Sequence, residues 1–246
     1  MIENPMTPND YARARRLLLR RDPVLAAVIR AHGACGLADA QRADHFSALV
    51  RAITFQQLST KAASTIHGRL MALMPAGTPP TPEALAAVSD GQFRAVGLSR
   101  QKSAYLRDLC GKVMSGALDL NGLDSMQDDE VIAALVQVKG IGRWSAEMFL
   151  MFRLHRPDVL PVGDLGIVNA VQKVYGLRKK PTPDRIRRIG DAWRPYRSVA
   201  AWYLWRSLDN VPVQAPEGPG TAAARRPVSR PVAVSASSTT GRRTIR

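Results

Sequence analysis

Apolar residues recur along most of this chain at the spacing that places them on one face of a helix. Between residues 44 and 55, for example, that face carries Phe46, Leu49, Val50 and Ile53. The same spacing, with caps and prolines at the starts, predicts further helices at residues 11–21, 23–31, 59–74, 100–115, 128–138, 142–154, 164–175, 183–193 and 196–208, and a short one beginning at Thr81 and Pro82. No stretch alternates as a strand would, so the pattern predicts an all-α fold.

The chain is also strongly basic. Among its 246 residues, 35 Lys and Arg outnumber 20 Asp and Glu, which gives a formal net charge of +15 and an isoelectric point near 10.8. A charge of this size favours a polyanionic partner, above all nucleic acid. The alternative is a proteome rich in arginine, in which basic surface residues carry little meaning.

Cysteine content and hydropathy bear on the compartment. Cys35 and Cys110 suit a reducing interior and are too few for a four-cysteine metal site. The first ten residues are polar and lack the apolar core of a secretory signal. No apolar run approaches the roughly 18 residues that a membrane span requires. We therefore expect a cytoplasmic protein without a membrane partner, associated with the nucleoid if the source is bacterial.

The most informative segment joins two of the predicted helices. The helix over 128–138 ends in Lys139-Gly140-Ile141-Gly142, and the next helix begins at once, so only a short hairpin can connect them. Two glycines one residue apart let the backbone approach a neighbour closely and tolerate positive φ. Their amides lie at a helix N-terminus, which favours an anion. In so basic a chain the expected anion is a nucleic-acid phosphate.

This hairpin, at about residues 128–154, resembles the helix-hairpin-helix motif of the base-excision DNA glycosylases. Asp164 follows Trp144 by twenty positions, within Pro161-Val162-Gly163-Asp164-Leu165-Gly166, where that superfamily carries its catalytic aspartate. The resemblance runs from about residue 45 to 208 and is closest to the 3-methyladenine DNA glycosylases. It implies two helical subdomains flanking an active-site cleft.

Asp164 has two interpretations. An aspartate that opens a helix is a good N-cap, which contributes about 1 kcal/mol. The resemblance instead makes it the catalytic carboxylate, because cleavage of an N-glycosidic bond develops positive charge on the sugar. A carboxylate close to that carbon either stabilises the charge or acts as a general base on water, and the sequence leaves both roles open.

The resemblance also implies a base pocket lined by Trp144, Trp205 and Met148. Bifunctional relatives carry a nucleophilic lysine where this chain has Trp144, so we expect a monofunctional hydrolase. Methylated purines are cationic, and electron-rich aromatic faces attract cations by ~0.5–2 kcal/mol. Met148 takes a place where some relatives have an aromatic residue. Trp193 and Trp202 are expected in the core.

DNA contacts are implied at two further places. The loop Gln56-Gln57-Leu58 matches the family loop that inserts a side chain into the duplex when a base is extruded. Gln57 is the expected plug with Gln56 beside it, and Leu58 is the alternative wedge. The alternative for the whole loop is an ordinary polar connection between helices. Lys61, Arg100 and Lys102 begin helices and either touch the DNA backbone or lie in solvent.

In the hairpin, Lys139, Gly140, Gly142 and Arg143 are the expected phosphate contacts. The family's hairpin carbonyls hold a monovalent cation, and by position those of Val136, Val138 and Ile141 correspond. Otherwise we expect no cofactor: the four-cysteine cluster of the iron–sulfur branch is absent, and no histidine pair has metal-ligand spacing.

The sequence thus predicts one glycosylase domain over residues 1–210. From about residue 211 Pro, Ala, Ser, Thr, Gly and Arg dominate, which predicts a disordered basic tail over 211–246. That tail either adds non-specific affinity for DNA or is solvated.

The predicted activity is excision of 3-methyladenine and 7-methylguanine from damaged double-stranded DNA by a monomer, leaving an abasic site. The alternatives are a glycosylase for deaminated or mismatched bases and a non-catalytic helix-hairpin-helix DNA-binding protein.

Overall fold

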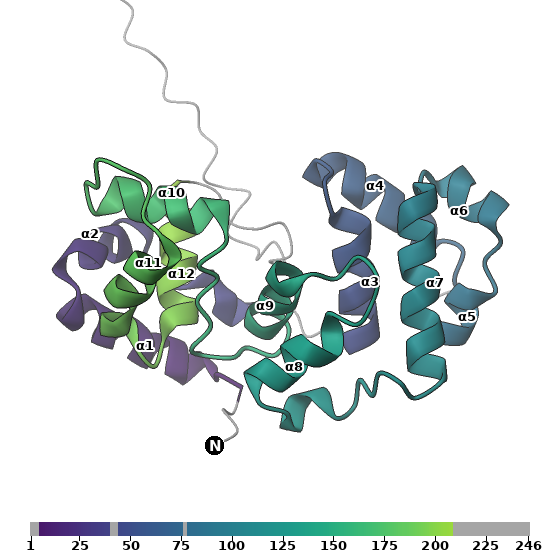
Figure 1. Cartoon of the computed structure of the whole chain (residues 1–246), viewed down its shortest axis with the longest axis horizontal. Coiled ribbons are helices and arrows are strands. Elements are labelled where there is room, and N and C mark those ends of the chain that lie inside the picture. Colours follow the sequence, from purple (N-terminus) through teal and green to yellow (C-terminus); the bar gives the residue numbers. More distant parts are fainter. Residues whose placement is uncertain (1–4, 40–43, 76–77, 209–246) are drawn as a thin grey trace, which may run out of the picture. The chain divides into compact units, whose positions relative to one another are not determined.

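The computed structural model describes residues 5–39, 44–75 and 78–208. Within these ranges the chain forms twelve α-helices and three 3-10 helices, and it forms no strand (Figure 1). The α-helices are α1 Pro8–Arg21, α2 Pro23–His32, α3 His45–Phe55, α4 Thr60–Met71, α5 Pro82–Ala86, α6 Asp90–Val96, α7 Arg100–Met114, α8 Asp128–Leu135, α9 Arg143–Phe152, α10 Leu165–Val174, α11 Pro183–Gly190 and α12 Arg197–Arg206. The 3-10 helices are η1 Gly36–Asp39, η2 Leu123–Ser125 and η3 Asp191–Trp193. The predicted all-α fold is confirmed.

The helices pack in two groups joined by a helical hairpin. In one group α7 packs against α3, α5 and α6, while α4 packs against α3 and α6. In the other, α12 packs against α1, α2 and α10, and η3 packs against α1 and α11. The hairpin helices α8 and α9 pack on one another, and α9 also contacts α3 (Figure 1). The hairpin therefore packs on the first group through α3.

Local signals set most helix boundaries. Ser89 and Gln92 form a reciprocal capping box that starts α6, so the segment after Thr81 holds two helices where the sequence pattern predicted one. Gln127 is the N-cap of α8 and forms a capping box with Glu130, and the helix itself begins at Asp128, as the sequence pattern predicted.

The tail predicted over residues 211–246 lies outside the described residues. In the part of the chain that the structure describes, no helix is both long and apolar enough to span a membrane.

Candidate active site

Asp164 begins α10 as its N-cap. Its backbone is extended, with φ −72° and ψ 124°, and its Oδ1 accepts the backbone N–H of Ile167 at 2.8 Å. The carbonyl of Pro161 accepts the Asp164 N–H at 3.0 Å, which closes the turn leading into the helix. The predicted capping function is confirmed.

Two tryptophans from other helices also bond to this carboxylate. Trp205 on α12 donates its Nε1–H to Oδ1 at 2.8 Å, and Trp144 on α9 donates its Nε1–H to Oδ2 at 2.6 Å. Asp164 itself is only 9% exposed. Three N–H donors thus hold one carboxylate, and each bond is of the kind that an ionised carboxylate accepts.

The residues around Asp164 differ sharply in exposure. Trp144 is 39% exposed and Leu165, the first residue of α10, is 62% exposed. Trp205 and Met148 are fully buried, and Trp205 stacks on Phe152 with ring centroids 6.0 Å apart.

Trp205 and Met148, which the resemblance places in the base pocket with Trp144, thus expose no surface in this structure, and their place in the pocket stays a prediction. Trp205 positions the carboxylate from the core side, and Met148 packs among the core residues of α9. Leu165, which the sequence pattern did not single out, supplies exposed apolar surface directly after Asp164.

Glu147 is a second acidic residue that the sequence analysis missed. It lies on α9 one turn after Arg143 and is only 8% exposed; its Oε1 accepts the Arg143 Nε–H at 3.1 Å. Burial raises the pKa of the Glu147 carboxyl, the Arg143 guanidinium lowers it in part, and the nearby charge of Asp164 raises it further. The available signal was an acid inside the apolar run of residues 145–152.

The hairpin glycines have different surroundings. Gly140 has φ +84°, and a Cβ atom built there would lie 2.1 Å from the ring of Tyr105, so only glycine fits. Gly142 is the N-cap of α9 in extended conformation, has no side-chain cap, and has nothing within 4 Å of an added Cβ. The open N-terminus of α9 has the geometry that the predicted anion site requires.

The basic side chains of the hairpin are exposed. The Arg143 side chain is 67% exposed even though it bonds to Glu147. Lys139 is exposed, and its backbone N–H donates to Asp108 Oδ2 at 2.9 Å. Of the residues whose carbonyls are predicted to hold a cation, Val138 accepts the N–H of Ile141 at its carbonyl oxygen at 3.0 Å, and Val136 is 41% exposed.

The loop over 56–58 separates its two glutamines. Gln57 is exposed and has positive φ, +56°. Gln56 caps the end of α3, and its Nε2–H donates to the carbonyl of Gly140 at 2.8 Å. The side chain of Gln56, the expected neighbour of the plug, is thus bonded to the hairpin in this structure. The insertion predicted for this loop, with Gln57 as the plug or Leu58 as the wedge, stays a prediction.

The residues from 50 to 195 match the HhH-GPD superfamily of base excision DNA repair proteins, and the chain belongs to this family. The predicted superfamily is thus confirmed. So is the predicted enzyme class, a DNA glycosylase of base-excision repair.

Three relatives illustrate the similarity. DNA-3-methyladenine glycosylase 1 of Schizosaccharomyces pombe is 35% identical over 68% of this chain and 74% of its own length. The solved structure of the S. pombe 3-methyladenine DNA glycosylase with abasic DNA matches with a TM-score of 0.71 and 32% identity, over 80% of this chain and 97% of that one. The DNA-3-methyladenine glycosidase of Bacillus halodurans matches with a TM-score of 0.70 and 38% identity, over 79% and 88% of the two chains.

Proposed function

We propose that this protein hydrolyses the N-glycosidic bond of alkylated purines in duplex DNA, with Asp164 as the catalytic carboxylate. One observation carries the proposal: three N–H donors hold the Asp164 carboxylate, and one of them belongs to the half-exposed Trp144. A carboxylate that is fixed in place yet adjoins an exposed aromatic face suits a reaction on an extruded nucleotide.

The reaction breaks the bond between C1′ of the sugar and the purine nitrogen, and the bonding electron pair leaves with the base. Positive charge develops on the sugar, and the Asp164 carboxylate stabilises it. The oxygen of water then bonds to C1′, and the water proton passes to Asp164 or to solvent. The product is an abasic site in an unbroken strand, because Trp144 offers no amine that could form a Schiff base.

Substrate preference follows from the surface beside Asp164. The face of Trp144 attracts the positive charge of a methylated purine, and Leu165 adds apolar contact. A purine that is already cationic leaves readily, so the site requires little acid catalysis. 3-Methyladenine and 7-methylguanine are therefore the proposed substrates.

The proposed DNA interface combines the hairpin and the loop over 56–58. Lys139, Arg143 and the open amides at Gly142 bind phosphate, while Gln57, exposed at positive φ, is the plug in the duplex. Leu58 is the alternative wedge.

The carbonyls of Val136, Val138 and Ile141 would hold a monovalent cation in the hairpin. Carbonyl oxygen is a ligand that such ions accept, and the Val138 carbonyl retains a lone pair beside its one bond. The cation would add positive charge next to the phosphate site. We further propose that the protein acts as a monomer in the cytoplasm.

The test is release of methylated purines from alkylated duplex DNA by the purified full-length protein. We expect 3-methyladenine and 7-methylguanine among the released bases and none from untreated DNA. Release of a deaminated or mismatched base without any methylated purine would overturn the proposed substrate class.

A further inference from the structure

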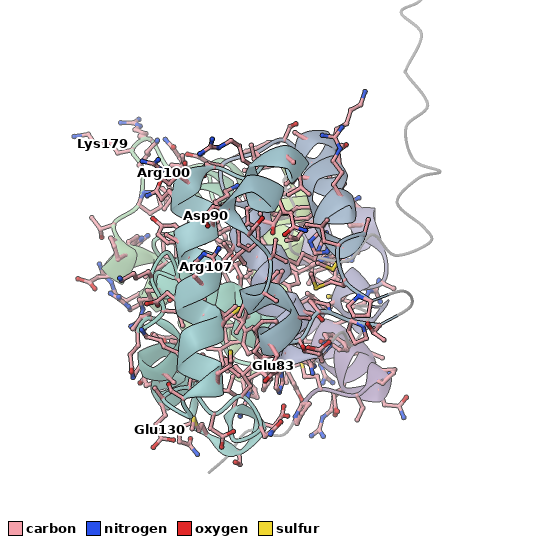
Figure 2. All side chains as sticks on the ribbon, turned by 90° about the vertical axis from the view of Figure 1, so that its right-hand side faces the viewer. Glu83, Asp90, Arg100, Arg107, Glu130 and Lys179 are labelled. Carbon is pink, nitrogen blue, oxygen red and sulfur yellow. The ribbon has the colours of Figure 1, made fainter. Side chains whose placement is uncertain are left out.

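One face of α7 contacts both parts of the proposed DNA interface. Lys102, Tyr105 and Asp108 are spaced by three residues and lie on the same side of this helix. On another side, Arg107 pairs with Asp90 of α6 at 2.6 Å (Figure 2), and α7 packs against α3, α5 and α6 within its helical group. We refer to Lys102, Tyr105 and Asp108 as the brace face.

Lys102 binds the start of the loop over 56–58. Its Nζ donates to the carbonyls of Thr54 and Gln56, both at 2.7 Å. The last carbonyls of a helix have no partner within the helix and carry partial negative charge, which a lysine ammonium satisfies. Lys102 therefore fixes the end of α3 and the first residue of the loop, directly before Gln57.

Tyr105 and Asp108 contact the backbone of the hairpin. The Tyr105 ring lies against Gly140, closely enough to exclude any Cβ atom there. Asp108 Oδ2 accepts the backbone N–H of Lys139 at 2.9 Å, and Lys112 pairs with the same carboxylate at 3.1 Å. The hairpin backbone is thus anchored at two successive residues.

Gln56 joins the two parts directly. Its side-chain amide crosses to the carbonyl of Gly140 at 2.8 Å, while Lys102 binds its backbone carbonyl. The loop and the hairpin are 84 residues apart in sequence, yet one side chain bonds them and one helix face supports both.

We propose that Gln56 and Lys102 are positioning residues that lock the loop over 56–58 to the hairpin, so that phosphate binding and insertion into the duplex act as one unit. A loop held in place before binding loses less conformational entropy when it enters the duplex. The hairpin grip on the backbone then sets where Gln57 meets the base stack. This inference rests on the proposed DNA interface.

The test compares two variants with one control. Gln56→Ala removes the bond to Gly140, and Lys102→Met removes both carbonyl bonds but keeps an apolar stem. Arg100→Met is the matched control, because Arg100 is an exposed cation at the start of the same helix (Figure 2). The measurements are dissociation constants for a duplex with an abasic-site analogue and for an undamaged duplex of the same sequence.

We expect Gln56→Ala and Lys102→Met each to lower the preference for the abasic duplex by about fivefold or more, the factor that one ordinary hydrogen bond contributes. Affinity for the undamaged duplex should stay within about twofold for Gln56→Ala, since its phosphate contacts are unchanged. Arg100→Met should weaken binding to both duplexes alike. Lys102→Arg, which keeps the donors, should restore most of the preference.

A second readout separates positioning from general destabilisation. Extruding a mispaired base costs less than extruding a paired one. The rate defect of both variants in single-turnover base release should therefore shrink when the methylated purine lies opposite a mismatch. A loss of folded protein would lower both rates equally, and thermal unfolding measures that loss directly.

Equal losses on both duplexes, or no loss at all in Gln56→Ala, would overturn the proposal. Gln56 is only partly buried, so Gln56→Ala is informative even if Lys102→Met does not fold. Release of methylated purine by the wild-type protein tests the proposed function separately. If no methylated purine is released, the proposed function fails, but the affinities for the abasic and the undamaged duplex still test whether Gln56 and Lys102 position the loop.

Discussion

Two buried aspartates in this protein are held by similar partners. Asp22 and Asp164 each cap a helix, with exposed fractions of 7% and 9%, and each accepts a tryptophan indole N–H. At Asp22, Oδ1 accepts the N–H groups of Val24 and Leu25, and Oδ2 accepts Trp193 Nε1–H at 2.8 Å and the Tyr175 hydroxyl at 2.5 Å.

The difference lies in what covers the second oxygen. Trp193 is fully buried and Tyr175 is partly buried, and burial together with the bond to Asp22 raises the pKa of Tyr175 well above its usual range, so Asp22 belongs to a largely buried structural network. At Asp164 the second oxygen instead meets Trp144, which is 39% exposed. A capping aspartate thus becomes available for chemistry when one of its donors reaches solvent.

The largest effect is expected for Asp164→Asn. Loss of the negative charge removes stabilisation of the transition state, so base release should fall at least ~100-fold. Asparagine still caps α10, and the new amide meets only the half-exposed Trp144, so stability should fall by about 1 kcal/mol. Single-turnover release of methylated purine and thermal unfolding measure the two effects. A variant that keeps the wild-type rate would assign the chemistry elsewhere.

Asp22→Asn should show the reverse behaviour. Its new amide would face the N–H of the buried Trp193 indole, and the partly buried Tyr175 hydroxyl would lose its carboxylate acceptor, which together cost about 2–3 kcal/mol. Denaturant unfolding measures this loss, and base release per folded molecule should stay at the wild-type rate. A rate defect as large as that of Asp164→Asn would end the distinction between the two aspartates.

The donor tryptophans offer a finer comparison. Trp193→Phe removes a buried hydrogen bond and leaves a small void, so it should cost about 2 kcal/mol of stability without changing the rate. Trp144→Phe removes one donor from Asp164 at a half-exposed position, so it should change stability by about 0.5 kcal/mol or less and slow base release by about fivefold. Unfolding and base release are measured for both variants. A rate loss in Trp193→Phe together with a stability loss in Trp144→Phe would refute the claim that the exposure of the donor tryptophan decides which aspartate is catalytic.

Glu147→Gln should produce the smallest effect, and that effect depends on pH. Because the folded-state pKa of Glu147 is raised, the folded protein holds this proton more tightly than the unfolded chain, so its contribution to stability is lost as pH rises through that pKa. Glutamine does not ionise. The unfolding midpoint of Glu147→Gln relative to wild type should therefore be higher at pH 7 than at pH 4, and an equal difference at both values would contradict the buried, protonatable carboxyl.

Much of the fold was predictable because its signals are local. The apolar spacing, the caps and the glycines of the hairpin gave the helices and their order, and Asp164 caps α10 as its sequence position indicates. Trp193 and Trp202 lie in the core as predicted, with exposed fractions of 0% and 8%.

The remainder depends on contacts between distant segments. Residues 198–205 of α12 are all buried, so the sequence shows no exposed face from which the orientation of Trp205 could be predicted. Gln56 bonds to a carbonyl 84 residues away, and Lys102 reaches back 46 and 48 residues to Gln56 and Thr54. A glutamine in a loop and a lysine at a helix start carry no sign of such partners.

In the proposed reaction water, and no protein amine, replaces the base beside Asp164. Borohydride trapping during base release from a duplex with one methylated purine tests this most directly, since borohydride reduces a Schiff base to a stable protein–DNA adduct. We predict free methylated base, an unbroken strand and no adduct. Lys139, the exposed lysine of the hairpin, is the residue to check. An adduct that disappears in Lys139→Ala would contradict the account and make the enzyme bifunctional.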